Sequence, residues 1–166
     1  RAFAVTVRGD IPDWLYRGLH GGRRDKSFLR SFFSKKRPPA PAGAPRQIKI
    51  YDSIINLLQQ VEREHFGREH SEMDTLYLLL HGDLLILDDL GTEFDTPFYI
   101  STIYNIINTR INRGLPTIIN TNLDLVSIRR RYEERIVSRL FAVYECMHFV
   151  GSDIRLIKKK NSEPLI

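Results

Sequence analysis

Leu84-Leu85-Ile86-Leu87-Asp88-Asp89 places four consecutive apolar residues directly before two carboxylates. A strand without a polar side is typical of the middle of a parallel sheet whose two faces are both covered. A second short run, Thr117-Ile118-Ile119-Asn120-Thr121-Asn122, is apolar at its centre and also ends in small polar residues. The two runs therefore predict two buried strands, each followed by polar side chains.

Helical patterns surround these strands. Ile48-Lys49-Ile50-Tyr51 alternates like a strand, and Asp52 or Ser53 can cap the helix that follows it. Thr96-Pro97 is a typical helix start, and Gly114 is a typical stop for that helix. We also expect helices around residues 73–80, from about residue 124 and over 133–141, and strands around 144–150 and 154–158. This alternation predicts an α/β fold with a parallel sheet.

Composition narrows the class of protein. The chain has 166 residues, of which 42% are hydrophobic and 27% charged, as expected for one globular domain. No apolar run approaches the roughly 18 residues that cross a bilayer, and no signal peptide opens the sequence, so we expect no membrane partner. Cys146 is the single cysteine, which excludes an internal disulfide and fits a cytoplasmic location.

The two polar strand ends carry the candidate chemistry. In open parallel sheets, ligands bind beyond the carboxyl ends of the strands. An acidic pair after a hydrophobic strand is typical of phosphoryl-transfer ATPases, where it holds Mg²⁺ and polarises an attacking water. Magnesium keeps most of its waters, so one or two carboxylates suffice. The alternative is that Asp88 and Asp89 only begin a turn before Gly91.

Five segments resemble, in order and in approximate spacing, the core of bacterial DnaC/IstB-type AAA+ helicase loaders. They are 83–93 (DLLILDDLGTE), 104–110 (YNIINTR), 116–123 (PTIINTNL), 131–140 (RYEERIVSRL) and 151–155 (GSDIR). The resemblance implies a three-layer parallel sheet of the P-loop AAA+ type. It also implies ATP or ADP with Mg²⁺ as cofactor and a replicative DNA helicase as partner.

The resemblance implies a role for each matching residue. Asp88 would be the Walker B acid associated with Mg²⁺, and Asp89 the residue that orients water. Asn122 would be sensor 1, whose amide contacts the γ-phosphate or the water. Arg139 would be the arginine finger that reaches a neighbour's nucleotide, which implies a homo-oligomer, and Arg155 would be the sensor 2 arginine.

Simpler interpretations of these polar residues stay open. Arg135 and Arg139 lie four residues apart on one helical face, so a solvated stripe paired with Glu133 and Glu134 is the alternative. Asn122 could be a turn residue at a strand end. The run of three arginines at 129–131 is typical of a helix surface, and with Lys158–Lys160 it could give weak contact with single-stranded DNA.

The first 47 residues depart from the family. A working phosphate loop needs G-x-x-x-x-G-K-[ST], and the candidate is HGGRRDKS at 20–27. Lys26 would bind phosphate and Ser27 would bind Mg²⁺, but Asp25 replaces a glycine and the loop is one residue short. Residues 35–45 hold four of the eight prolines and favour extended chain.

These features divide the chain and set the functional expectation. Residues 1–47 are predicted to be a poorly ordered, degenerate phosphate-loop region, 48–160 the AAA+ ATPase core, and 161–166 a tail. We expect an ATP-binding protein that supports DNA replication by helicase loading, with ATPase activity weak or lost. The alternatives are a non-catalytic AAA+-shaped module for oligomerisation or partner binding, and a helper ATPase for transposition.

Overall fold

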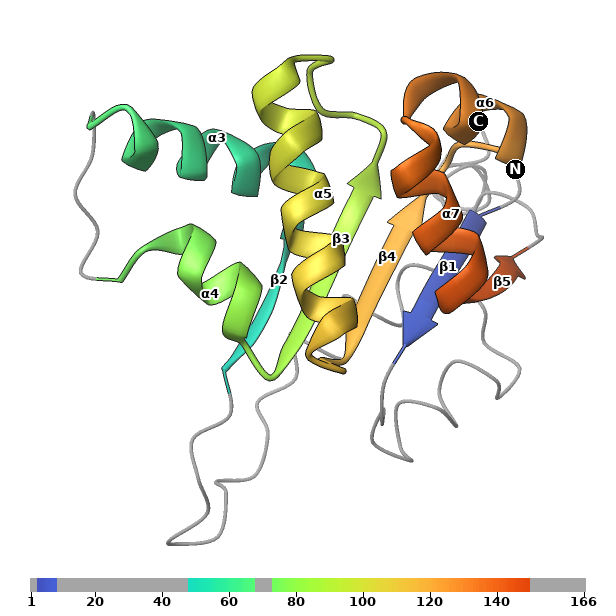
Figure 1. Ribbon diagram of the computed structural model, residues 1–166, viewed down its shortest axis with the longest axis horizontal. Helices are drawn as coiled ribbons and strands as arrows, with labels where there is room; N and C mark the ends of the chain where they lie inside the picture. The colour runs from blue at the N-terminus through green and yellow to red at the C-terminus, as the bar shows by residue number, and fades with distance from the viewer. Residues whose placement is uncertain (1–2, 9–47, 68–72, 150–166) are drawn as a thin grey trace, which may run out of the picture.

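The computed structural model describes residues 3–8, 48–67 and 73–149, which form one five-stranded sheet with helices packed on it (Figure 1). The strands are β1 (Phe3–Arg8), β2 (Lys49–Ser53), β3 (Leu84–Leu90), β4 (Thr117–Thr121) and β5 (Glu145–Phe149). The helices are α3 (Ile54–His65), α4 (Thr75–His81), α5 (Pro97–Asn112), α6 (Leu125–Arg131) and α7 (Glu134–Val143). The strand order is β2-β3-β4-β1-β5.

The predicted parallel sheet is confirmed for three strands. β2 pairs in parallel with β3, and β3 pairs in parallel with β4, so that Ile86 lies opposite Ile118. We call the side of the sheet at which these three strands end its carboxyl edge. The expected strand near 144–150 is confirmed as β5, whereas the one expected at 154–158 lies outside the described residues.

β1 was not expected from the sequence, and its direction breaks the all-parallel pattern. It is antiparallel to both of its neighbours, β4 and β5. Ala4 lies opposite Thr121 and Arg8 lies opposite Thr117. The chain therefore leaves β1 at the side where β4 begins, which is the side opposite the carboxyl edge.

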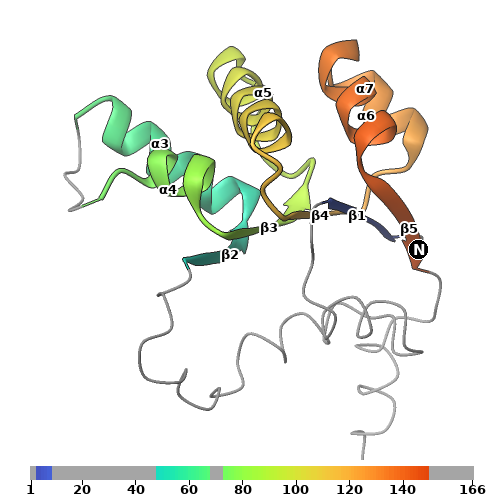
Figure 2. The same cartoon turned by 60° about the horizontal axis from the view of Figure 1, so that its bottom comes forward.

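All the helices of the described ranges lie on the same face of the sheet (Figure 2). Each parallel connection crosses over this face, as β-α-β units with a common handedness require. The described part of the chain thus has two layers. The other helical layer of the expected three-layer fold would have to come from residues outside the described ranges.

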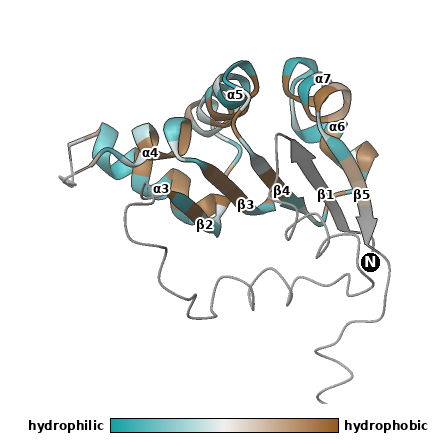
Figure 3. Ribbon diagram, turned by 90° about the horizontal axis from the view of Figure 1, so that it is seen from below, coloured by the Kyte–Doolittle hydropathy of each residue, from teal (hydrophilic) through white to brown (hydrophobic). Residues whose placement is uncertain are grey.

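The core lies between this helical layer and β3, which is buried along almost its whole length and is largely hydrophobic (Figure 3). The helices start where their caps predict: Ser53, Thr96 and Asp124 each accept a hydrogen bond from the backbone N–H three residues on. Apolar side chains at helical spacing then face the sheet. Members of this core include Ile54, Leu58, Val61, Leu85, Leu87, Ile103, Ile107, Ile119, Ile136 and Leu140.

A buried arginine lies at the side of the sheet where the parallel strands begin. Arg110 of α5 is 0% exposed, and its guanidinium donates to Thr117 Oγ1 at 2.8 Å. It also donates to the backbone carbonyls of Leu79, Gly82 and Pro116 at 2.8–3.0 Å. Burial lowers the pKa of Arg110 to about 10. This arginine therefore ties α5 to the end of α4 and to the start of β4.

Candidate functional site

The carboxyl ends of β3 and β4 bring three predicted site residues together. Asp88 is buried, Asp89 is half-buried and Asn122 is exposed. The side-chain amide of Asn122 donates a hydrogen bond to Asp89 Oδ1 at 3.3 Å. The two polar strand ends that the sequence singled out are therefore in direct contact at the carboxyl edge.

Asp88 is held on both of its carboxylate oxygens. Tyr51 Oη donates to Oδ2 at 3.1 Å, and the amide of Asn120 donates to Oδ1 at 3.2 Å. The backbone N–H of Asp89 also donates to Oδ1, at 3.1 Å. Asp88 is 4% exposed, so these donors replace most of the water around its carboxylate. Neighbouring strands on both sides of β3 thus fix the orientation of this acid.

Asn120 adds an unsatisfied oxygen beside Asp88. It is 2% exposed, and its amide nitrogen donates a hydrogen bond to Asp88 Oδ1. Its Oδ1 is buried and has no hydrogen-bond partner within the described residues. Buried amide oxygens usually find a donor. Sequence reasoning assigned no role to this position, because it lies inside an otherwise apolar strand.

Asp89 lies in a strained turn. Its φ is 57°, and among the described residues no other non-glycine residue has a positive φ. Its carbonyl accepts from Thr92 N at 3.1 Å and from Thr92 Oγ1 at 2.9 Å. Left-handed backbone is costly for side chains other than glycine and is held by surrounding contacts. The turn before Gly91 that the sequence allowed is present, and the strained aspartate faces Asn122.

Gly91 shows why this turn needs glycine. Its φ is 102°, a conformation that side chains rarely adopt. A Cβ at this position would lie 2.4 Å from Leu123 Cδ1. The turn after β3 therefore packs directly on the segment after β4, with no space between them.

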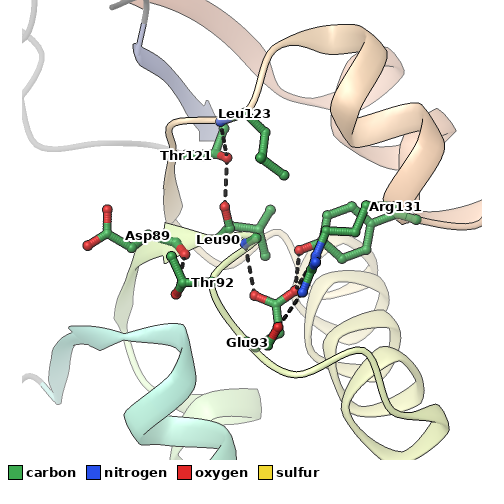
Figure 4. A network of polar contacts seen from close by, with 9 residues as sticks. Asp89, Leu90, Thr92, Glu93, Thr121, Leu123 and Arg131 are labelled. Atoms are coloured by element: carbon green, nitrogen blue, oxygen red, sulfur yellow. Dashed lines mark hydrogen bonds and ion pairs between the residues drawn. The ribbon is translucent and has the colours of Figure 1, made fainter.

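Glu93 is a site residue that the sequence did not single out. It is 3% exposed, and its carboxylate accepts from Gly91 N at 2.8 Å and from Arg131 Nε at 3.2 Å. Tyr132 Oη donates to the same carboxylate, and Arg131 Nη2 donates to the Glu93 carbonyl (Figure 4). We call Glu93, Arg131 and Tyr132 the Glu93 cluster. The run 129–131 was expected on the helix surface: Arg129 and Arg130 are exposed, whereas Arg131 is 25% exposed and is held by Glu93.

Arg131 and Tyr132 both keep their protons beside Glu93. Burial alone would lower the pKa of Arg131, but the charge of Glu93 and the hydrogen bonds with Tyr132 and Glu93 together offset this, and the pKa is raised. Burial and then the charge of Glu93 raise the pKa of Tyr132 far above its ordinary value. Both side chains therefore remain hydrogen-bond donors to Glu93 at neutral pH.

Arg139 lies against its own chain. Its Nε donates to Asn108 Oδ1 at 2.9 Å, and its guanidinium lies 4.8 Å from the ring centre of Tyr104. Arg135 lies 4.6 Å from the same ring and forms an ion pair with Glu133 at 2.7 Å. The solvated-stripe alternative thus describes Arg135. The contacts of Arg139 are with α5 and α7, and not with the carboxyl edge.

The remaining predicted site residues, Lys26, Ser27 and Arg155, lie outside the described residues. Within the described ranges, no group of three or more histidine, cysteine or acidic residues could hold a metal ion. Cys146 is a free, half-buried thiol whose pKa is raised by burial, which disfavours the reactive thiolate. No helix in the described part of the chain is long and apolar enough to cross a membrane.

The fold and the site define an α/β protein whose five-stranded sheet contains three parallel strands, with helices packed on it and a polar carboxyl edge. This layering is compatible with Rossmann-like and P-loop proteins. Comparison of the chain with protein-family models, with curated proteins and with solved structures finds no match.

Proposed function

We propose that this chain is a DnaC/IstB-like AAA+ protein that binds ATP or ADP with Mg²⁺ at the carboxyl edge and supports helicase loading in DNA replication. The observation that carries the proposal is the contact of Asp89 with Asn122 beside the buried acid Asp88. Two acids and an amide at the ends of adjacent parallel strands suit phosphoryl chemistry. The helicase partner and the homo-oligomer rest on the sequence resemblance.

The donor set fits a hydrated magnesium ion with nucleotide. Mg²⁺ prefers oxygen ligands, keeps several waters and uses one or two carboxylates together with substrate phosphates. Asp88 would hold a Mg²⁺-bound water, since an ionised carboxylate can accept hydrogen bonds from several donors at once. When bound, the ion would neutralise charge on the phosphates. Asp89 would accept a hydrogen bond from water, and Asn122 would donate one to a phosphate oxygen.

We expect turnover to be weak or absent. The segment that resembles the phosphate loop has Asp25 before Lys26, where the family has glycine. An aspartate there adds a Cβ and places negative charge beside the phosphates. Phosphate loops also follow the carboxyl end of a strand and open a helix. β1 instead ends opposite the start of β4.

The direction of β1 favours a second candidate function. This candidate is a non-catalytic module that keeps the AAA+ shape and oligomerises or binds a partner without hydrolysing nucleotide. The contacts of Arg139 are consistent with this second candidate, because its guanidinium donates to Asn108 and lies over the ring of Tyr104 in the same chain. A transposition helper would use the same carboxyl edge as a helicase loader and would differ only in its partner.

Calorimetric titration with ATP and Mg²⁺ tests the proposal. We expect binding with Kd above about 100 µM, which EDTA and Asp88→Asn remove. Asp89→Asn should retain binding and abolish any residual hydrolysis. Asp95→Asn is the matched control, since Asp95 is an exposed acid in the neighbouring β3–α5 loop. Absence of Mg²⁺-dependent binding at millimolar ATP would reject the proposal in favour of the second candidate, and low-micromolar affinity would reject the expected weakness.

A further inference from the structure

Glu93 lies beside the proposed nucleotide site without belonging to it. Its carboxylate lies between the backbone of Gly91 and the junction between α6 and α7 (Figure 4). We infer that Glu93 is a positioning residue that holds the Asp89–Asn122 pair, and that Arg131 and Tyr132 anchor it. This inference rests on the proposed function, because the pair matters only if it acts on nucleotide.

The side chain of Glu93 is held in a single orientation. The side chain of Glu93 is fully buried, while that of Arg131 is 25% exposed. The carboxylate accepts from one backbone N–H, one guanidinium and one phenol. A buried carboxylate with this many donors has little freedom to rotate, because each rotation would leave a polar group unpaired.

The first connection from Glu93 to the pair runs along the chain. Glu93 Oε2 accepts from Gly91 N, and Gly91 is two residues after Asp89. Both Gly91 and Asp89 have positive φ, at 102° and 57°. Such a turn persists only where surrounding contacts determine it. The Glu93–Gly91 hydrogen bond is a contact of this kind, so it fixes the direction in which Asp89 projects.

The second connection runs across the strands. Gly91 packs on Leu123 so closely that even a Cβ would clash. Thr121 Oγ1 donates to Leu90 O at 2.7 Å and accepts from Leu123 N at 3.1 Å. Asn122 lies between these two residues, so the backbone on both of its sides is attached to the β3 turn. Displacement of Gly91 would therefore move both partners of the Asp89–Asn122 hydrogen bond.

The anchors of Glu93 belong to a different part of the molecule. Arg131 ends α6, and Tyr132 lies between α6 and α7. α7 packs on α5 through Arg135 and Arg139, whose guanidinium groups lie over the Tyr104 ring. The Glu93 cluster therefore joins the α6–α7 junction, which precedes the helix that carries Arg139, to the turn that carries Asp89.

Amide NMR of the full chain without nucleotide tests the positioning directly. Glu93→Gln and Tyr132→Phe should shift or broaden the side-chain amide signals of Asn122 and the backbone amide signal of Gly91. Arg129→Met is the matched control, because Arg129 is an exposed arginine on the same helix as Arg131. Tyr132→Phe removes one oxygen atom and keeps the ring, so it remains informative if Glu93→Gln does not fold. Unchanged Asn122 signals in a folded variant of either kind would overturn the inference.

Calorimetry with ATP and Mg²⁺ provides the functional readout. Residues that orient the groups around a metal–phosphate site typically change its affinity about tenfold or more when mutated. We therefore expect Glu93→Gln to weaken Mg²⁺-nucleotide binding roughly tenfold. Unchanged affinity in a variant whose Asn122 signals have moved would overturn the inference. Absence of binding by the wild-type chain would instead reject the proposed function, and the NMR result would still decide whether Glu93 positions the pair.

Discussion

Asp89 and Gly91 show that the carboxyl edge depends on backbone shapes that most side chains avoid. The acid proposed to orient water has a φ of 57°, and the glycine two residues later has a φ of 102°. Strained backbone of this kind often occurs where a side chain must face a ligand. The same strain makes this turn sensitive to small substitutions.

Gly91→Ala should lower the free energy of unfolding by about 2–4 kcal/mol. The new Cβ would require an unfavourable φ and would meet Leu123 Cδ1 at 2.4 Å. Gly114→Ala is the control, because Gly114 also has a positive φ but a Cβ added there would meet no atom within 4 Å. The control should cost only about 1 kcal/mol. Urea unfolding measures both, and equal costs would show that Leu123 yields to the added methyl group.

Arg110→Met should lower the free energy of unfolding by about 3–5 kcal/mol, since it removes the guanidinium donor of the buried carbonyls of Leu79 and Gly82. The carbonyls of Leu79, Gly82 and Pro116 all accept from this guanidinium. Arg113→Met, three residues later at the exposed end of α5, should change stability by less than about 0.5 kcal/mol. Chemical denaturation measures both variants. Equal shifts of their denaturation midpoints would contradict the stabilising role of Arg110.

Glu64 of α3 accepts hydrogen bonds from Thr75 of α4, and the stability that this contact provides depends on pH. Burial would raise the pKa of Glu64, but hydrogen bonds from Thr75 and Gln60 lower it below 4.5. Thr75 donates its backbone N–H and its hydroxyl, at 2.7 and 2.6 Å. Because the folded-state pKa is depressed, this stabilisation is complete above the unfolded-state pKa and is lost as the pH falls through the folded-state pKa.

Glu64→Gln tests that linkage between α3 and α4. At pH 7 the substitution should cost about 1 kcal/mol, because a neutral amide is a weaker acceptor and replaces one oxygen by a donor. Below the folded-state pKa the wild type and the variant should be equally stable. Urea unfolding from neutral to acidic pH checks the prediction, and a stability difference that persists in acid would refute it.

The elements with local signals were predictable from the sequence. Ser53, Thr96 and Asp124 are the observed helix caps, and the apolar run before Asp88 is the central strand. What the sequence did not reveal depends on partners far along the chain. Glu93 and Arg131 are 38 residues apart, and nothing in either segment identifies the other. β1 also had no local sign of its antiparallel direction, because its partners determine that direction.

For the whole molecule, the net charge of +5 permits contact with nucleic acid, and the basic runs at 129–131 and 158–160 predict that any contact with single-stranded DNA is weak. Arg129 and Arg130 are exposed, whereas Arg131 is held by Glu93 and contributes little. With about three to five phosphates neutralised, affinity should fall roughly ten- to a hundredfold between about 50 and 200 mM salt. Anisotropy with a labelled oligonucleotide measures this fall. Tight binding that survives high salt would indicate base stacking, for which the two arginines offer no aromatic partner.

The reversed strand β1 has a consequence for how the chain folds. Its partners in β4 and β5 lie more than a hundred residues later, whereas the parallel strands β2, β3 and β4 follow one another at short separations. Pairings between such distant segments form slowly, because a long loop must close before any contact is gained. Before β1 pairs with β4, the backbone N–H and C=O groups on one side of β4 are unpaired, and they can pair with a strand of another molecule. We therefore expect the pairing of β1 to be a slow step of folding, and the interval before it to be the one in which this protein is most prone to aggregate.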